Sequence, residues 1–299
     1  MTHPIFNIFD TPSIKMEMDD RIMPSRVATL VDGDYVVVPQ YCEVEPTMQS
    51  FRMDAVEHIY QMSHGLDIGN AAAWTAVRLF DTFYAASTNS AWQLQTPIVS
   101  AVCLDIAGKS VSWDLNPCGH PRTIVYFYNT ICNRNTVTEE KFKQFFFYVE
   151  SVVLNALKFD VMIPTPDEYL SECSRWFDTC NAARGSPKRP LVEVNVASMT
   201  SYIVSAIMYS PQSMSFTALE IAGYASYIAT EPARTSPQSH IIDPPTMKGL
   251  WSMIAWTRSN KLSEILLDSI EMICKNKPDT ILARIYPLEH EKWKATCQL

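Results

Sequence analysis

From Met48 to Lys275, apolar residues recur at the spacing of one helix face, and this periodicity limits the possible folds more than any other feature of the sequence. Side chains three and four positions apart lie on the same side of an α-helix, so the pattern predicts a succession of amphipathic helices. Glycine is scarce, with 8 among 299 residues, which disfavours turn-rich β folds because few positions can take a positive φ. We therefore predict an all-α protein.

Capping residues mark where several helices begin. Thr96 is a capping residue placed directly before Pro97, and proline is favoured at the first position of a helix. Thr136 and Glu139 have the spacing of a capping box, in which two side chains bond the first free amides of a helix. We expect helices to begin at both places, and the second helix to continue to Leu157.

Pro164 and Pro166 cannot continue that helix, so they mark a junction near 160–166 between two halves of similar pattern. Each half has material for about five helices, and we predict two tandem five-helix bundles. The expected division is an irregular N-terminal segment at 1–47, a first bundle at 48–160, a second bundle at 161–276 and a tail at 277–299.

The charge balance and the length of the apolar runs narrow the class of partner. Proteins that bind DNA or RNA usually carry a basic surface, whereas this chain has a net charge of −8. No apolar run reaches the roughly 18 residues that a membrane-spanning helix needs. The 8 cysteines include no CxxC pair, so free thiols in a reducing compartment are a better interpretation than a metal site. We expect no nucleic acid, membrane or metal as a partner.

The sequence contains none of the common catalytic or cofactor-binding motifs. GxGxxG and GxxxxGK[ST], which bind nucleotide phosphates, are absent, and so is the GxSxG of many hydrolases. No pair of carboxylates and no pairing of cysteine with histidine stands out from what chance supplies in a chain of this size. We predict that the protein is not an enzyme, needs no cofactor and has no small-molecule substrate.

Three stretches carry a resemblance to one known family. The first combines Arg52, in FRMDAVEHI, with Asp81, in AVRLFDTF, at a matching interval. In that family the aspartate is followed by an arginine, which Thr82 replaces here. The second stretch, AVCLDIAGK, is similar to a central helix that ends in a lysine, and the lysine is Lys109 in this sequence.

The third stretch, FYVESVVLNALKFDVMIPTPDEYL, is the most specific. It joins Glu150, an apolar run at helical spacing, the pair Phe159-Asp160 and a Pro-Thr-Pro sequence in the order found in cyclins. The chain therefore resembles the cyclin family over residues 48–275, closely in the first half and only in general pattern in the second. The resemblance implies that the two bundles are cyclin boxes.

The resemblance also implies a non-catalytic function. A cyclin binds a cyclin-dependent kinase and holds the kinase's C-helix and activation segment in the active position. The family's paired lysine and glutamate correspond to Lys109 and Glu150, which suit exposed backbone groups of a partner. The apolar residues that flank this pair in cyclins correspond to Ile106, Leu154, Phe159 and Val161. Taken singly, each of these residues also fits an ordinary helix end, helix surface or core.

Departures from the family leave alternatives open. Ser110, Val111 and Ser112 replace the acidic residues that follow the lysine in cyclins. A cyclin-fold scaffold that binds a kinase or a transcription complex without activating it is therefore the main alternative. A cyclin-fold protein of the general transcription factor IIB type, which binds DNA, is disfavoured by the net charge of −8.

The substrate-docking groove of cyclins is also altered. Its positions correspond here to Phe51, Asp54, Ala55 and His58. An aspartate in an apolar groove resists a leucine ligand, so we expect weak or no binding of arginine-x-leucine peptides. Such divergence resembles that of viral cyclins, and the cyclins of piscine retroviruses are a candidate that the length suits. The resemblance implies a function in cell-cycle progression or transcription, in the nucleus and cytoplasm of the host if the protein is viral.

Overall fold

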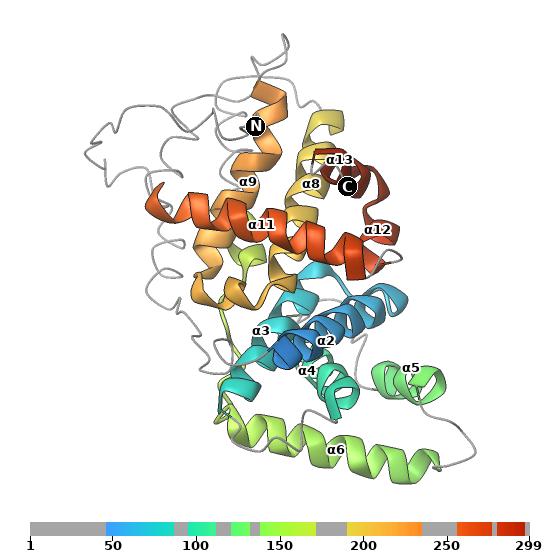
Figure 1. The fold of residues 1–299 in the computed structure, drawn as a ribbon. Helices are drawn as coiled ribbons and strands as arrows, with labels where there is room; N and C mark the ends of the chain where they lie inside the picture. The colour runs from blue at the N-terminus through green and yellow to red at the C-terminus, as the bar shows by residue number, and fades with distance from the viewer. Residues whose placement is uncertain are drawn as a thin grey trace.

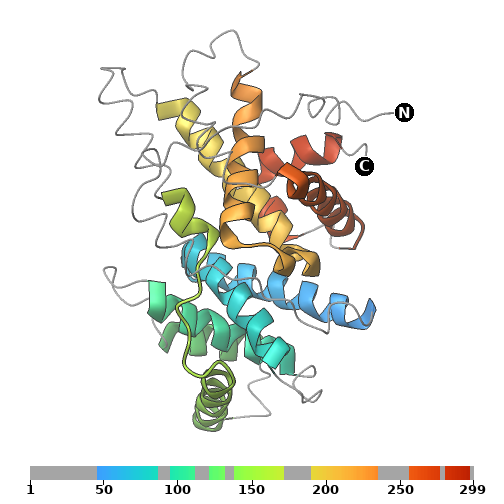
Figure 2. The same cartoon turned by 90° about the vertical axis from the view of Figure 1, so that its left-hand side faces the viewer.

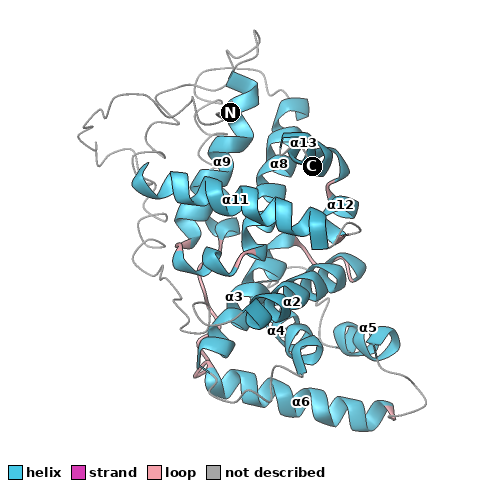
Figure 3. Cartoon of the chain, in the orientation of Figure 1, coloured by secondary structure: helices cyan, strands magenta, loops and turns pink. Residues whose placement is uncertain are grey.

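The structure is a computed structural model that describes residues 46–86, 95–111, 121–131, 138–171, 190–234, 256–276 and 280–296. Helices account for most of these ranges, and no strand occurs in them (Figure 3). The predicted all-α class is confirmed. Residues 1–45, most of the predicted N-terminal segment, lie outside the described ranges, as do residues 112–120. No described helix is both long and apolar enough to cross a membrane.

The first bundle surrounds one central helix. It consists of α2 (Pro46–Gly65), α3 (Asn70–Ala86), α4 (Thr96–Val111), α5 (Pro121–Ile131) and α6 (Glu139–Ala156). α4 packs against all the others, and it is buried on nearly every side between Ile98 and Ala107, as its mostly apolar sequence requires. Figures 1 and 2 show this bundle below the second one, with α6 along its lower edge.

The second bundle is built around α8 (Pro190–Tyr209). The other elements described in this half are the 3-10 helix η4 (Pro211–Ser215), α9 (Ala218–Arg234), α11 (Trp256–Asn276), α12 (Ile281–Ile285) and α13 (Pro287–Thr296). α8 packs against each of them and also against α2 and α3 of the first bundle. Buried side chains from both bundles therefore join in one apolar core.

Two helices, α4 and α6, begin at or close to the capping residues predicted from the sequence. α4 begins at Thr96, with Pro97 in its first turn, as predicted. α6 begins at Glu139, but its cap is Thr138 and not Thr136, which corrects the predicted capping box. The hydroxyl of Thr138 accepts a hydrogen bond from the amide of Lys141 at 3.4 Å. Both threonines have the right chemistry, and the backbone conformation decides which of them caps.

The end of the chain contributes to the core and is more than a tail. Residues 281–296 form α12 and α13, and Thr280 caps α12 by accepting a hydrogen bond from the amide of Leu282. Ile281, Leu282 and Trp293 are buried. A helix as short as α12 spans little more than one turn, so periodicity could not reveal it.

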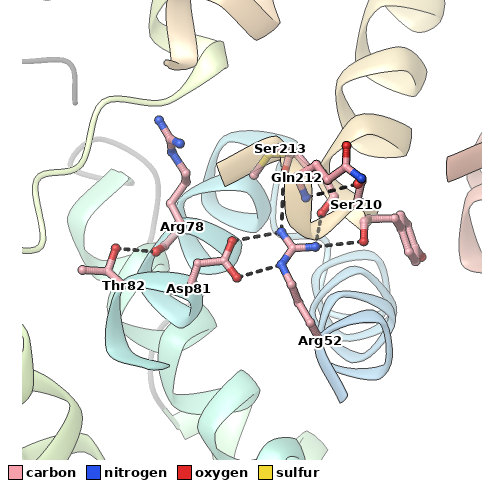
Figure 4. A network of polar contacts seen from close by, with 9 residues as sticks. Arg52, Arg78, Asp81, Thr82, Ser210, Gln212 and Ser213 are labelled. Atoms are coloured by element: carbon pink, nitrogen blue, oxygen red, sulfur yellow. Dashed lines mark hydrogen bonds and ion pairs between the residues drawn. The ribbon is translucent and has the colours of Figure 1, made fainter. Parts of the chain in front are cut away.

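Arg52 ties the two bundles together through a buried network (Figure 4). Its guanidinium pairs with the carboxylate of Asp81 on α3 through two contacts of 2.9 Å, and both side chains are almost fully buried. The same group donates to the main-chain carbonyls of Met208 and Tyr209, each at 2.8 Å, at the C-terminal end of α8. That end of a helix carries partial negative charge, so both sets of partners suit a cation.

Glu57 is the anionic counterpart of Arg52 on the same helix. Its carboxylate accepts hydrogen bonds from the Ile281 amide at 2.9 Å and from the Thr280 hydroxyl at 3.0 Å, at the start of α12. The hydroxyl of Tyr209 on α8 donates to the same carboxylate. The start of a helix attracts negative charge, so α2 presents a matched charge to each of two helix ends in the second bundle.

His290 on α13 is buried against α8 and α11. Its Nδ1 atom lies 3.1 Å from the Tyr202 hydroxyl, and its Nε2 atom lies 3.8 Å from the sulfur of Cys274. Burial lowers the pKa of His290 below its ordinary value, while the Glu291 carboxylate acts to raise this pKa and the Lys294 ammonium acts to lower it. The neutral imidazole is therefore the form that the folded protein prefers.

We expect the free energy of unfolding to fall as the pH decreases below about 6.5, the ordinary pKa of histidine in an unfolded chain. Below that pH the unfolded chain takes up a proton that the folded protein disfavours, and above it the contribution of His290 is fully present. Urea unfolding at about pH 7.5 and about pH 5.5 measures the effect. In His290→Gln the difference between the two pH values should shrink, and an unchanged difference would contradict the assignment.

Candidate partner-binding face

Two charged residues from different helices meet at one face of the first bundle. Lys109 lies in the last turn of α4, and Glu150 lies on α6. The Nζ atom of Lys109 is 2.7 Å from Oε1 of Glu150. Their side chains are 42% and 17% exposed, so a partner can reach both. The structure therefore brings together the two residues that the family resemblance paired.

A third charged residue completes this cluster, although the sequence analysis did not single it out. Asp105 lies one turn before Lys109 on α4, and its Oδ2 atom is 2.7 Å from Nζ of Lys109. Its side chain is only 1% exposed. The signal in the sequence was the spacing of four residues between the two charges, in a helix with no other charged residue.

The carboxylates of Asp105 and Glu150 set the direction in which the pKa of Lys109 shifts. Burial around the ammonium acts to lower the pKa of Lys109, but the hydrogen bonds and charges of Asp105 and Glu150 outweigh it. The pKa therefore lies above its ordinary value, and Lys109 is charged at neutral pH. Two carboxylates and one ammonium give the cluster a formal charge of −1, which suits a partner that brings N–H donors.

The helix that carries Glu150, α6, ends in an uncommon backbone conformation. Lys158 and Phe159 have φ values of 54° and 60°, a region that glycine usually occupies. The amide of Phe159 donates to the Leu154 carbonyl at 2.8 Å, and the amide of Lys158 donates to the Asn155 carbonyl at 3.1 Å. This is the Schellman pattern of helix ends. Side chains held in such strained positions are concentrated at functional sites.

The four apolar residues expected around the charged pair differ in how much of each side chain is exposed to a partner. Phe159 is 66% exposed, and Leu154 and Val161 are half-buried. Ile106 is 5% exposed and belongs to the core, so it cannot provide contact surface, contrary to the expectation. It lies on the side of α4 that packs within the bundle.

Two further large side chains, on α6 and in the segment after it, are exposed and were not singled out in the sequence. Met162 is 70% exposed, in the extended chain after α6, and Phe147 is 45% exposed, three residues before Glu150 on α6. Residues three apart lie on one side of a helix, so Phe147 and Glu150 share a face. The signal for Phe147 was the run FFFY at 145–148, which is longer than one buried helix face can absorb.

The residues at the positions of the docking groove lie along α2. Ala55 is fully buried and cannot line a surface groove. Phe51, Asp54 and His58 are half-buried, and Nδ1 of His58 is 2.7 Å from the carbonyl oxygen of Asp54 within the same helix. The expected weakness of peptide docking at these positions stays a prediction.

The cysteines in the described ranges offer no reactive thiol. There, Cys103 is buried in α4 and Cys274 is half-buried on α11, and both are free thiols. Burial raises the pKa of the Cys103 thiol well above its ordinary value, with the Asp81 charge adding to the effect, so it is held in the unreactive form. No group of three or more histidine, cysteine or acidic side chains in these ranges is arranged to hold a metal ion.

Comparison with known proteins identifies the fold. No family model matches the sequence, and no curated protein is significantly similar to it. Among solved structures, a viral cyclin from herpesvirus saimiri matches with a TM-score of 0.54 and 14% identity, over 75% of this chain and 85% of that one. A chain of the yeast RNA polymerase II CTD kinase complex matches with a TM-score of 0.54 and 13% identity, over 95% and 85%. The chain therefore has a divergent cyclin-like fold.

The strained end of α6 leads to a stability prediction. We expect Lys158→Gly to raise the free energy of unfolding by about 0.5–1 kcal/mol, because glycine adopts a positive φ without steric cost. Urea unfolding measures the change. Gln144→Gly, at an exposed and regular position of the same helix, is the control and should lower stability by about 1 kcal/mol. A loss of stability in Lys158→Gly would show that the side chain of Lys158 contributes more than its backbone strain costs.

Proposed function

We propose that the protein is a non-catalytic regulatory subunit that binds a cyclin-dependent kinase through the face formed by α4 and α6. The observation that carries this proposal is the Lys109–Glu150 pair, 2.7 Å apart, on α4 and α6, with the exposed side chain of Phe159 at the end of α6. The lysine offers donors and the glutamate offers acceptors to backbone groups of a partner, and the aromatic ring offers apolar contact area. In this proposal the bound kinase keeps its C-helix and activation segment in the active position.

A rigid surface suits this function. A subunit activates a kinase only by binding the active conformation better than the inactive one. That conformation requires a glutamate of the kinase C-helix to pair with the lysine that contacts the ATP phosphates. The central position of α4 and the four buried side chains that anchor α6 hold the proposed face in one arrangement before binding. These anchors are Phe142, Phe146, Val149 and Val153.

The similar solved structures support a kinase as the class of partner. One is described as a viral cyclin and the other as an RNA polymerase II CTD kinase complex. At 14% and 13% identity these likenesses establish the fold, and the kinase partner of this chain is our proposal. A function in cell-cycle progression or in transcription, in the nucleus and cytoplasm, belongs to the same proposal.

A second candidate is a scaffold that binds the kinase without activating it. The observation in its favour is the end of α4, where Ser110, Val111 and Ser112 follow Lys109 directly. Ser110 and Val111 are the last residues of α4; the hydroxyl of Ser110 donates a hydrogen bond to the Ala107 carbonyl at 2.9 Å, and Val111 is 43% exposed. A partner group that pairs with acidic residues at this place in cyclins would find no charge here.

The experiment uses the tagged full-length chain as bait. Retained kinases from a cell extract are identified, and purified cyclin-dependent kinases of the cell-cycle and transcription classes are then tested for binding and for activity on histone and polymerase-tail peptides. The proposed function requires binding and a rise in activity above that of the kinase alone. Binding without a rise supports the scaffold. If none of the kinases binds the wild-type chain, both candidates are wrong.

A further inference from the structure

Asp105 is a buried carboxylate to which the proposed function assigns no role. α4 contains two charged residues, Asp105 and Lys109, and the first of them lies in the buried part of the helix. Burying a carboxylate is costly unless a cation or several donors compensate for the lost water, and an apolar side chain at this place would avoid that cost. The Oδ2 atom of Asp105 lies 2.7 Å from the ammonium of Lys109, which supplies such compensation.

The position of Lys109 depends on this contact. A free lysine side chain has many rotamers, and ordering it on binding is one of the costs that weaken an interface. Here the ammonium contacts Asp105 from its own helix and Glu150 from the neighbouring helix, each at 2.7 Å. Two carboxylates on different helices restrict the side chain more than one can.

We propose that Asp105 is a positioning residue that holds Lys109 beside Glu150 before any partner binds. The consequence for a kinase rests on the proposed function. Two of the three N–H groups of the ammonium point to the two carboxylates, and the third is left for an acceptor on the partner. The contact to Lys109 uses Oε1 of Glu150, so Oε2 is available for a donor. The partner therefore meets one donor and one acceptor in fixed places.

A second lysine of the same bundle provides a matched comparison. Lys143 on α6 pairs with Glu139 at 2.7 Å, also at a spacing of four residues. The two lysines are similarly exposed, 42% for Lys109 and 39% for Lys143, but Glu139 is 53% exposed whereas Asp105 is 1% exposed. Exposed pairs of this kind restrict their side chains little. The Asp105–Lys109 pair thus differs from the Glu139–Lys143 pair in the burial of its carboxylate, and Lys109 also contacts a second carboxylate, that of Glu150.

The first test uses the free protein and needs no kinase. Lysine side chains labelled with 13C and 15N are observed by NMR in the wild type, in Asp105→Asn and in the control Glu139→Gln. In the wild type the Lys109 side chain should be more ordered than that of Lys143. Asp105→Asn should make Lys109 as mobile as Lys143 and lower the pKa of its ammonium, and Glu139→Gln should leave Lys109 unchanged. If Lys109 is equally ordered with and without the Asp105 charge, the proposal is wrong.

The second test separates positioning from a merely structural effect. Binding of a purified cyclin-dependent kinase is measured for Asp105→Asn in the wild-type background and in the Lys109→Met background. We expect Asp105→Asn to weaken binding by about three- to ten-fold when Lys109 is present and to have no further effect when it is absent. Equal losses in both backgrounds would overturn the proposal, because Asp105 would then act through the fold of α4.

Asp105→Leu provides a second variant in case Asp105→Asn does not fold, since leucine fills the buried site without an unpaired polar group. Like Asp105→Asn, it should make the Lys109 side chain as mobile as that of Lys143.

The two tests also distinguish failure of the proposed function from failure of the inference about Asp105. If no kinase binds the wild type but the NMR result holds, the proposed function fails and the positioning of Lys109 stands. If kinase binds and Lys109 is unaffected by Asp105→Asn, only the inference about Asp105 fails.

Discussion

Replacing Glu150 with alanine is expected to weaken the binding of a cyclin-dependent kinase by thirty-fold or more, equivalent to a loss of about 2–5 kcal/mol. The loss arises because donors of the kinase would be buried without an acceptor. The free protein should stay folded, since Glu150 lies at the surface between the buried anchors Val149 and Val153. Lys109 also keeps a partner in this variant, because Asp105 is 2.7 Å away.

Binding is measured by titration calorimetry, and circular dichroism verifies the fold. Glu139→Ala is the control, because this exposed glutamate on the same helix also pairs with a lysine but lies outside the proposed face. It should change binding by less than about 1 kcal/mol. Wild-type affinity in Glu150→Ala would remove the main support for kinase binding through α4 and α6.

The structure changes how the lysine of the pair should be tested. Lys109→Ala removes a contact of the proposed face but also removes the ammonium that lies 2.7 Å from the buried carboxylate of Asp105. Such a variant should lose stability as well as affinity, so a binding defect in it has two causes. Combining Lys109→Ala with Asp105→Leu removes both charges and restores a clean comparison with Glu150→Ala.

Arg52→Ala is expected to lower the free energy of unfolding by about 3–5 kcal/mol, a large part of the stability of a typical domain. The substitution removes the guanidinium that pairs with the buried carboxylate of Asp81 and that donates to the carbonyls of Met208 and Tyr209. Because these contacts join α2 and α3 to α8, we expect the two bundles to lose their connection together. Urea unfolding monitored by circular dichroism measures the change.

Two further variants define the cause of that loss. Arg52→Lys keeps the charge but cannot reach the carboxylate and both carbonyls at once, so its stability should lie between those of the wild type and Arg52→Ala. The double variant Arg52→Met with Asp81→Leu should recover part of the loss, because no unpaired charge stays buried. If Arg52→Ala costs less than about 1 kcal/mol, the network does not hold the bundles together.

Local patterns in the sequence were sufficient for the class of fold. The apolar spacing indicated helices because a helix must bury one face, and the mostly apolar stretch at 98–107 indicated the central helix because only a surrounded helix buries nearly every face. The pairing of Lys109 with Glu150 came from the resemblance to cyclins. Periodicity alone places the two residues on separate helices 41 positions apart, with nothing to show that those helices are neighbours.

The packing of one helix on another decided which residues are buried and which main-chain groups they contact. Ile106 was expected at the contact surface from the family pattern, yet it lies inside the bundle, and Asp105, which the sequence did not single out, is buried and contacts Lys109. The functions of Arg52 and Glu57 depend on carbonyls at the end of α8 and on an amide at the start of α12. Every residue carries such main-chain groups, so no pattern of side chains indicates which of them a buried charge will meet. Only the position of α2 against the second bundle brings those charges and helix ends within hydrogen-bond distance.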